Sequence, residues 1–258
     1  MTVLSIITIN LNNKAGLAET FASVFCQQAA PFEYIVIDGG STDGSRELIQ
    51  QHAGQLTYWI SEKDRGIYDA MNKGIAAARG EYFLFLNSGD SLAEPDTLER
   101  CQQYQTRYPE ADILYADFYQ VSEGETAPKQ YRYPARFTLK ELKKHIPCQQ
   151  ASLVKATLLK ETGNFPLRYR IASDYWMYVK SFLLGKKWVH MNFVMARYNT
   201  DGLSVSQAQI CYTEMNEIWK ELVPEPMRRD IDRWDALKKS RWGILWTRLL
   251  SKLGIQSS

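Results

Sequence analysis

Closely spaced cysteines are missing from this chain of 258 residues, which has four in all: Cys26, Cys101, Cys148 and Cys211. No two of them form a C-x-x-C pair, so a zinc site and a disulfide framework are disfavoured and reduced thiols are expected. No apolar run approaches the roughly 18 residues that a membrane-spanning helix needs. The N-terminus also lacks the basic segment that opens a secretory signal. We therefore expect a soluble, cytoplasmic protein.

A large excess of charge is missing too. The chain has 31 Lys and Arg against 29 Asp and Glu, a net charge of +2, which gives no case for a nucleic-acid partner. No G-x-G-x-x-G follows the first predicted strand, which argues against a dinucleotide oxidoreductase. Residues 8–14 contain one lysine and no glycine, which disfavours a sugar-phosphate nucleotidyltransferase with its glycine-rich, basic phosphate loop. The chain does have 45% hydrophobic residues, as expected of a globular protein with one large domain.

Short β-branched and aromatic runs alternate with helical patterns over the first 117 residues. Such alternation predicts a mostly parallel sheet covered by helices, and hence an α/β fold. Strands are predicted at 3–9, 34–37, 57–60, 82–86 and 112–117, with helices at 15–28, 45–52, 66–79 and 94–108. Further on, the pattern predicts a hairpin at 119–134, helices at 139–144, 155–162 and 174–184, and a strand at 188–198.

Carboxylates follow two of the predicted strands. Asp38 comes directly after the run 34–37, and Asp90 closes the polar turn after the run 82–86. In an open α/β sheet, ligands bind beyond the carboxyl ends of the strands, so the two residues suggest a nucleotide-diphosphate site. Asp38 could accept hydrogen bonds from the base or ribose, and Asp90 could hold Mg²⁺ or Mn²⁺ with phosphate and water completing the shell. The alternative for both is a role in turn formation alone.

Two more acids stand at the starts of predicted helices. Asp69 lies in the first turn after Gly66, where it could bind a ligand or simply favour the helix dipole. Arg65 could neutralise a diphosphate or pair with Asp64 on the surface. Asp174 opens an apolar helix, as a general base or as an N-cap.

Together these stretches resemble the family 2 (GT-A) glycosyltransferases, and most of all the bacterial exopolysaccharide branch with its colanic-acid-type transferases. The resemblance covers roughly residues 3–206 and depends on SIITIN (5–10), VIDGGSTDG (36–44), SEKDRGIYDAMNKGI (61–75) and FLNSGD (85–90), with a weaker match in IASDY (171–175). Two departures stand out. Asn87 and Gly89 replace two acids of the usual Asp-x-Asp-Asp motif, and Ser173 replaces the glutamate that usually precedes the base.

The resemblance implies a GT-A, Rossmann-like catalytic domain at 1–206, with a nucleotide-sugar half at 1–117, an acceptor half at 118–206 and a helical extension at 207–258. It implies an inverting, metal-dependent, hexosyltransferase-type enzyme that moves a sugar from a nucleotide-diphosphate donor to a lipid-linked saccharide in surface polysaccharide synthesis. The implied site comprises Asp174 as catalytic base, Asp90 as metal ligand, and Thr8, Asn10, Asp38, Arg65 and Asp69 as nucleotide-sugar-binding residues. A catalytically silent nucleotide-sugar-binding or scaffold protein is the alternative that the lost motif acids leave open.

Basic and tryptophan residues gather in the last part of the chain. Residues 228–258 contain eight Lys or Arg against three Asp, and three of the seven tryptophans. A basic, tryptophan-bearing amphipathic helix predicts peripheral attachment to the inner face of the cell membrane. The apolar positions that would share this helical face are Ile231, Trp234, Leu237, Trp242, Leu245, Leu249 and Leu253. The alternative is a helix packed on the catalytic domain or on a second subunit.

Overall fold

The computed structural model describes residues 4–29, 31–122, 127–200, 202 and 206–239. The chain divides into two compact units, residues 1–215 and 216–258, and each is described by itself. Of the apolar face predicted for the C-terminal helix, Trp242, Leu245, Leu249 and Leu253 lie outside the described residues, as does Trp246. No helix in the described part of the chain is both long enough and apolar enough to cross a membrane.

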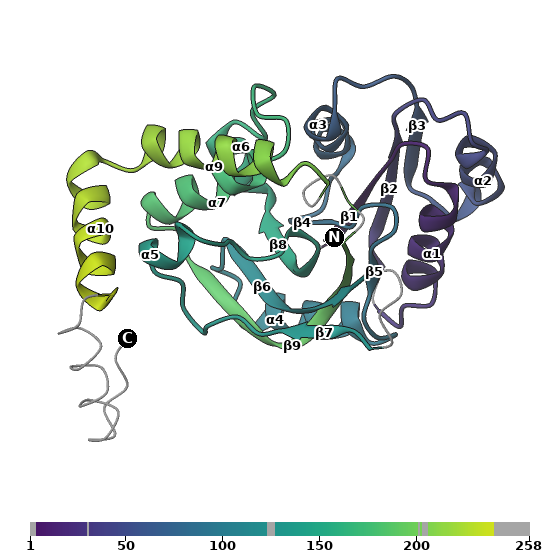
Figure 1. The fold of residues 1–258 in the computed structure, drawn as a ribbon. Helices are drawn as coiled ribbons and strands as arrows, with labels where there is room; N and C mark the ends of the chain where they lie inside the picture. Colours follow the sequence, from purple (N-terminus) through teal and green to yellow (C-terminus); the bar gives the residue numbers. More distant parts are fainter. Residues whose placement is uncertain (1–3, 30, 123–126, 201, 203–205, 240–258) are drawn as a thin grey trace. The chain divides into compact units, whose positions relative to one another are not determined.

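One nine-stranded sheet organises the first unit, in the order β3-β2-β1-β4-β8-β6-β9-β5 with β7 paired to β6 (Figure 1). The strands β1, β2, β3 and β4 run parallel to one another, and β6 runs parallel to β9. The strands are β1 (Leu4–Asn10), β2 (Glu33–Asp38), β3 (Tyr58–Ser61), β4 (Tyr82–Phe85), β5 (Ser91–Leu92), β6 (Ile113–Val121), β7 (Lys129–Tyr131), β8 (Ser152–Lys155) and β9 (Trp188–Asn199). The predicted α/β fold with a parallel sheet is confirmed.

Helices cover both faces of the parallel half. Figure 1 shows α1 and α2 on one side of β1, β2 and β3 and α3 on the other. The helix α3 lies so close to the sheet that a Cβ on Gly74 would fall 2.4 Å from Cγ2 of Ile7, so a side chain there would push the helix away. The helices are α1 (Lys14–Phe25), α2 (Ser45–Gln51), α3 (Ile67–Ala77), α4 (Thr97–Arg107), α5 (Leu139–Leu142), α6 (Ala156–Thr162), α7 (Ser173–Leu183), α9 (Ala208–Leu222) and α10 (Glu225–Lys239), with short 3₁₀ turns η1 (Ala53–Gln55) and η2 (Gln149–Ala151).

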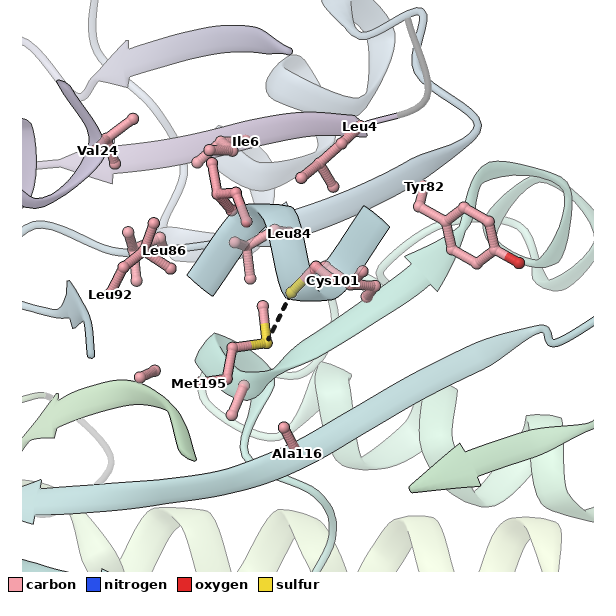
Figure 2. Close-up of a cluster of buried hydrophobic side chains, with 14 of the residues drawn as sticks. Leu4, Ile6, Val24, Tyr82, Leu84, Leu86, Leu92, Cys101, Ala116 and Met195 are labelled. Carbon is pink, nitrogen blue, oxygen red and sulfur yellow. Dashed lines mark hydrogen bonds between the residues drawn. The ribbon is translucent and has the colours of Figure 1, made fainter. Parts of the chain in front are cut away.

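The core on the α1 and α4 side joins both halves of the sheet. Leu4, Ile6 and Leu84 from the parallel strands are fully buried in it, and so is Met195 of β9. Figure 2 shows Met195 beside Cys101 of α4, with the two sulfur atoms 3.9 Å apart. Burial of this extent contributes roughly 1.5–3 kcal/mol for each large apolar side chain. The strands whose ends form the candidate site are therefore held in place by a fully buried core.

The second half of the sheet differs from the simple alternation that the sequence predicts. The strand β8 lies between β4 and β6 and is antiparallel to both. It is only four residues long and runs directly into α6, so the helical pattern of 155–162 hides it. The predicted hairpin at 119–134 is present, because β6 continues to Val121 and pairs antiparallel with β7. The helix predicted at 66–79 ends at Ala77 with Ala78 as its cap, and two residues later Gly80 donates its N–H to Ser5 and Glu33.

The second unit holds the end of α9 and all of α10 in the described residues. Ile218, Trp219 and Val223 are buried, whereas α10 exposes Met227, Trp234 and Leu237 by 49%, 55% and 59%. The predicted C-terminal helical extension is therefore present as far as the structure describes it.

Candidate functional site at the carboxyl edge of the sheet

Three strand ends meet at one edge of the sheet. The parallel register pairs Asn10, the last residue of β1, with Asp38, the last residue of β2. The chain after β4 joins them, because Ser88 donates its N–H to the carbonyl of Ile9 and its own carbonyl accepts from Asn13 Nδ2 at 3.1 Å. Residues predicted separately from the sequence are thus brought together by the parallel pairing, as the rule for open α/β sheets requires.

The Asp38 carboxylate is fully buried and organises the loop that follows it. Its Oδ1 accepts from Asn10 Nδ2 at 2.8 Å and from Ser41 Oγ, while Oδ2 accepts from Ser61 Oγ at 2.6 Å. The N–H groups of Gly40 and Ser41 also donate to Oδ2. Burial alone would raise the pKa of Asp38, but the hydrogen bonds from Ser41, Ser61 and Asn10 outweigh it and hold the pKa below its usual value. A direct contact between Asp38 and a nucleoside would require some of these bonds to break.

Asn10 and Thr8, the two β1 residues predicted to bind the donor, are both buried. The amide Nδ2 of Asn10 donates to Asp38. The Oδ1 of Asn10 is buried and has no hydrogen-bond partner among the described residues. Thr8 is completely buried and donates its hydroxyl to the carbonyl of Leu86 at 2.7 Å. Asn10 therefore offers a hydrogen-bond acceptor at the edge, whereas Thr8 ties β1 to the end of β4.

Arg65 and Asp69 form a pair at the start of α3. One carboxylate oxygen of Asp69 accepts from Arg65 Nη2 at 2.6 Å and from Nε at 3.2 Å, and the other accepts the backbone N–H of Arg65. These bonds hold the pKa of Asp69 below its usual value. Gly66 lies between them with φ +125°, a backbone conformation that favours glycine. The Arg65 side chain is 75% exposed, so its guanidinium is accessible to an anionic group.

Asp90 ends a tight turn and is almost completely buried, with 5% exposure. The turn closes with the Asp90 N–H donating to Asn87 O at 3.0 Å, and Gly89 within it has φ +97°. Its carboxylate accepts from the backbone N–H of Asn199 at 2.9 Å and from the side chain of Gln150. Burial nevertheless raises the pKa of Asp90 to about 7. The Asp90 carboxyl group is therefore partly protonated near neutral pH, and a cation bound beside it would displace the proton.

The residues around Asp90 fit a divalent cation that is also bound to a diphosphate. Among the described residues, Asn87 Oδ1 is buried and has no hydrogen-bond partner, and such orphaned acceptors are rare. Asn87 and Asp90 lie in one turn, and both carry oxygen atoms of the type that Mg²⁺ and Mn²⁺ prefer. Among the described residues no group of three or more His, Cys, Asp or Glu could hold a metal. A cation here would therefore depend on phosphate oxygens and water for most of its ligands.

Asp174 lies in the first turn of α7 and bonds to the helix that carries Asp69. The hydroxyl of Tyr68 lies 2.9 Å from Asp174 Oδ1 and 2.6 Å from the carbonyl of Ile171. Burial raises the pKa of Asp174. Because a hydroxyl carries one proton that rotates freely, Tyr68 can donate to the ionised carboxylate. It can also accept from the protonated carboxyl while it donates to Ile171. Asp174 therefore has Tyr68 as a hydrogen-bond partner in both of its protonation states, which suits a residue that takes up and releases a proton.

The segment around η2 carries two further groups that interact with Asp90. Burial raises the pKa of the Cys148 thiol, and the negative charges of Asp90 and Asp174 raise it further. The neighbouring Gln150 bonds to Asp90. Sequence reasoning missed Gln150, Tyr68 and Asn199, because a glutamine, a tyrosine and a backbone N–H carry no spacing pattern. Of the three residues, only Tyr68 lies inside a motif that the sequence identified, the one at residues 61–75.

A hollow of about 410 Å³ lies elsewhere on the first unit, over β6, β7 and β9. Arg100, Asp117 and Asn192 are among the residues that line it, and none of the predicted site residues does. The candidate site is therefore the edge of the sheet at the strand ends rather than this hollow.

Comparisons with known proteins identify the family of this chain. The model of the family described as Glycosyl transferase family 2 matches residues 5–163. A PGL/p-HBAD biosynthesis glycosyltransferase of Mycobacterium bovis is 33% identical over 206 residues, which cover 77% of each chain. An uncharacterised glycosyltransferase of Mycobacterium tuberculosis is 31% identical over 202 residues, which cover 77% of this chain and 76% of the relative.

Solved structures share the fold at low identity. S. aureus TarS in complex with UDP-GlcNAc superposes with a TM-score of 0.69 at 20% identity, over 89% of this chain and 70% of that chain. The mannosyltransferase PcManGT of Pyrobaculum calidifontis, in complex with GDP-Man and Mn²⁺, has a TM-score of 0.57 at 14% identity, over 96% of this chain and 84% of that chain. The fold that the sequence predicted is therefore the GT-A type.

Proposed function

Because this chain belongs to glycosyl transferase family 2, we propose that it transfers a sugar from a nucleotide-diphosphate donor to an acceptor hydroxyl with inversion at the anomeric carbon. The observation that carries the proposal is the Asp174 carboxyl group. It has a raised pKa and a hydroxyl partner in Tyr68 that suits both of its protonation states. The negative charges of Asp174 and Asp90 both raise the pKa of the Cys148 thiol, and Asp90 follows β4 at the edge where a donor diphosphate is expected.

In the proposed reaction the acceptor oxygen attacks the anomeric carbon from the face opposite the diphosphate. Asp174 takes the proton of that hydroxyl as the new carbon–oxygen bond forms. The bond between the anomeric carbon and the phosphate oxygen breaks, and the nucleoside diphosphate leaves with the electron pair. A base in this position typically contributes ~10²–10⁴-fold to the rate.

Asp90 and Asn87 are the residues that would hold Mg²⁺ or Mn²⁺. When bound, the cation would offset the negative charge that develops on the departing diphosphate. Gln150 and the N–H of Asn199 orient the Asp90 carboxylate. Much of the remaining rate acceleration would come from the correct orientation of donor and acceptor in the site.

For the nucleoside part of the donor we propose the loops around Asn10, Asp38 and the Arg65–Asp69 pair. Asn10 offers its unpartnered Oδ1, and Arg65 offers an exposed cation for the diphosphate. Asp38 acts mainly by holding its loop, given its full set of hydrogen bonds. TarS binds UDP-GlcNAc and PcManGT binds GDP-Man, so uridine and guanosine donors are the first to test. A catalytically silent nucleotide-sugar-binding protein is the alternative, and donor turnover distinguishes the two.

A donor panel tests the proposal directly. We expect one UDP, GDP or dTDP sugar with Mn²⁺ to raise the melting temperature and to be turned over. Saturation at ~100 times Kd adds about 2.7 kcal/mol, which corresponds to roughly 5–10 °C at 2–4 °C per kcal/mol. Asp69→Ala should weaken binding of the bare nucleotide, because it removes the partner that orients Arg65. Lys73→Ala, which removes a lysine of α3 and its pair with Glu62 in the loop before that helix, is the matched control.

Two outcomes of the panel would count against the proposal. If Asp69→Ala and the control bind the nucleotide equally well, Asp69 serves only the start of α3. If a sugar nucleotide binds but no transfer or hydrolysis follows in the presence of metal, the silent binding protein is the better description.

We propose further that the acceptor is a lipid-linked saccharide of surface polysaccharide synthesis and that α10 attaches the enzyme to the membrane surface. The support is the exposure of Trp234 and Leu237 on a helix that also carries Arg229 and Arg233. Aromatic and apolar side chains flanked by arginine suit the boundary between headgroups and acyl chains. Each basic residue near an anionic leaflet contributes about 1 kcal/mol.

Vesicle binding tests this attachment. We expect the full chain to bind vesicles containing anionic lipid and the double variant Trp234→Glu/Leu237→Glu to bind much more weakly with unchanged donor turnover. Tyr212→Glu, at an aromatic of similar exposure on α9, should bind like the parent chain. A full chain that ignores anionic vesicles would instead favour a helix that packs on protein.

A further inference from the structure

Three consecutive backbone N–H groups before α7 donate to one carboxylate. Glu214 Oε1 accepts from Arg170 N at 2.7 Å, and Oε2 accepts from Ile171 N at 2.9 Å and from Ala172 N at 3.0 Å. All four residues belong to the first unit. Glu214 reaches this loop from α9. Hydrogen bonds to an ionised acceptor are roughly twice as strong as neutral ones, so this contact is a firm attachment.

The contacts of Glu214 lie immediately before the first turn of α7. The residue at the N-cap of α7 is Ala172, which has no side chain able to accept a hydrogen bond. Within the first turn, the Asp174 N–H donates to the Tyr68 hydroxyl at 3.4 Å and the Tyr175 N–H donates to Asp174 Oδ1 at 2.8 Å. Glu214 binds the N–H of Ala172 and those of the two residues before it, so it holds the entry to α7 from a distant helix.

The same peptide units are held from the other side by Tyr68. Its hydroxyl lies 2.6 Å from the carbonyl of Ile171, while the N–H of Ile171 donates to Glu214. Two residues after Ala172 the chain reaches Asp174, whose Oδ1 contacts Tyr68. The position of the Asp174 carboxylate is thus determined by a short loop with one anchor on α3 and one on α9.

We propose that Glu214 is a positioning residue for Asp174, which acts by binding the N–H groups of residues 170–172 and so fixing the start of α7. The proposal rests on the proposed function, in which Asp174 takes the acceptor proton. Glu214 makes no contact with the reacting atoms, so its loss should act on the geometry of proton transfer and leave donor binding unchanged. A misplacement of about 1 Å can lower a rate by ~10²-fold.

The test compares Glu214→Ala, Glu214→Gln and a control, Glu217→Ala, which removes an exposed glutamate from the same helix. We expect Glu214→Ala to lower kcat by roughly 10- to 100-fold with donor Kd unchanged. Glu214→Gln should fall between this variant and the parent chain, because its one amide oxygen can accept from Ile171 and Ala172 but its NH₂ group opposes Arg170. Hydrogen exchange of the amides of residues 170–172 should become faster in the order parent, Gln, Ala.

These measurements test the positioning role of Glu214 separately from the proposed sugar transfer. Unchanged exchange at residues 170–172 in Glu214→Ala would overturn the anchor. Faster exchange with unchanged kcat would overturn the positioning role, and an equal loss in Glu217→Ala would assign the effect to α9 as a whole and overturn it too. Failure of the parent chain to turn over any sugar nucleotide would overturn the proposed function, and the positioning role with it, before any variant is compared.

Discussion

Replacement of Asp174 by asparagine is expected to lower kcat by ~10²-fold or more with little change in the donor Kd. Asparagine keeps the size of the side chain and can still accept a hydrogen bond from Tyr68, but it cannot take a proton. The lost interaction belongs to the transition state, so binding of the ground-state donor should persist. Steady-state kinetics and nucleotide titration of the same preparation measure the two quantities.

The pH dependence of kcat in the parent chain should report the ionisation of Asp174. Proton abstraction requires the ionised carboxylate, so kcat should fall as the pH drops through the pKa of Asp174. Because burial raises that pKa, the fall should begin at a higher pH than for an exposed aspartate. The raised pKa also means that ionisation of Asp174 lowers the stability of the folded state as the pH rises through it. Asp174→Asn should therefore melt at an equal or higher temperature than the parent chain at neutral pH.

Two other outcomes would assign Asp174 a different role. A collapse of donor affinity in Asp174→Asn would make it a binding residue. A loss of about 1 kcal/mol of stability with a near-normal rate would make it a helix-start residue. The matched control is Asp117→Asn, which changes a buried carboxylate on β6 that pairs with His190.

Replacement of Asp90 by asparagine is expected to abolish turnover and metal-dependent donor binding while circular dichroism remains unchanged. The fold should survive because burial raises the pKa of this carboxyl to about 7, so the folded chain accommodates the protonated form, which asparagine resembles. Metal binding should fail because the only charged ligand of the proposed set is lost. Mn²⁺ titration in the presence of the matching nucleoside diphosphate measures this directly.

Protons and metal should compete at Asp90 in the parent chain. As the pH falls below about 7 the carboxyl group becomes protonated, so the apparent Mn²⁺ affinity should weaken there. Excess chelator should stop turnover and spare the fold. Full activity of Asp90→Asn, or of the parent chain in chelator, would remove the metal role from this residue. Asp117→Asn should leave the Mn²⁺ titration unchanged and serves again as the control.

The order of elements in the parallel half could be predicted from the sequence. The runs that became β1, β2 and β4 are mostly apolar and are buried at every position because both of their faces are covered, and such runs can be recognised without a structure. Asp38 and Asp90 follow these runs directly, so their place at the sheet edge followed from topology alone. The strand β8 could not be predicted, since four residues that merge into a helix leave no periodic signal.

Which side chains act together was decided by the tertiary structure. The motifs containing Asp69 and Asp174 are recognisable in the sequence, but only the packing of α3 against the start of α7 brings Tyr68 to Asp174. Three of the five donors to Asp38 belong to Gly40 and Ser41 just after it, but Asn10 and Ser61 reach it from β1 and β3. The pKa of about 7 for Asp90 depends on burial and on Gln150 and Asn199, which are distant in the sequence. Glu214 has no local feature that links it to the loop at 170–172. Burial and hydrogen bonding between distant segments set the pKa values and the orientation of these groups, and no local pattern of residues encodes either.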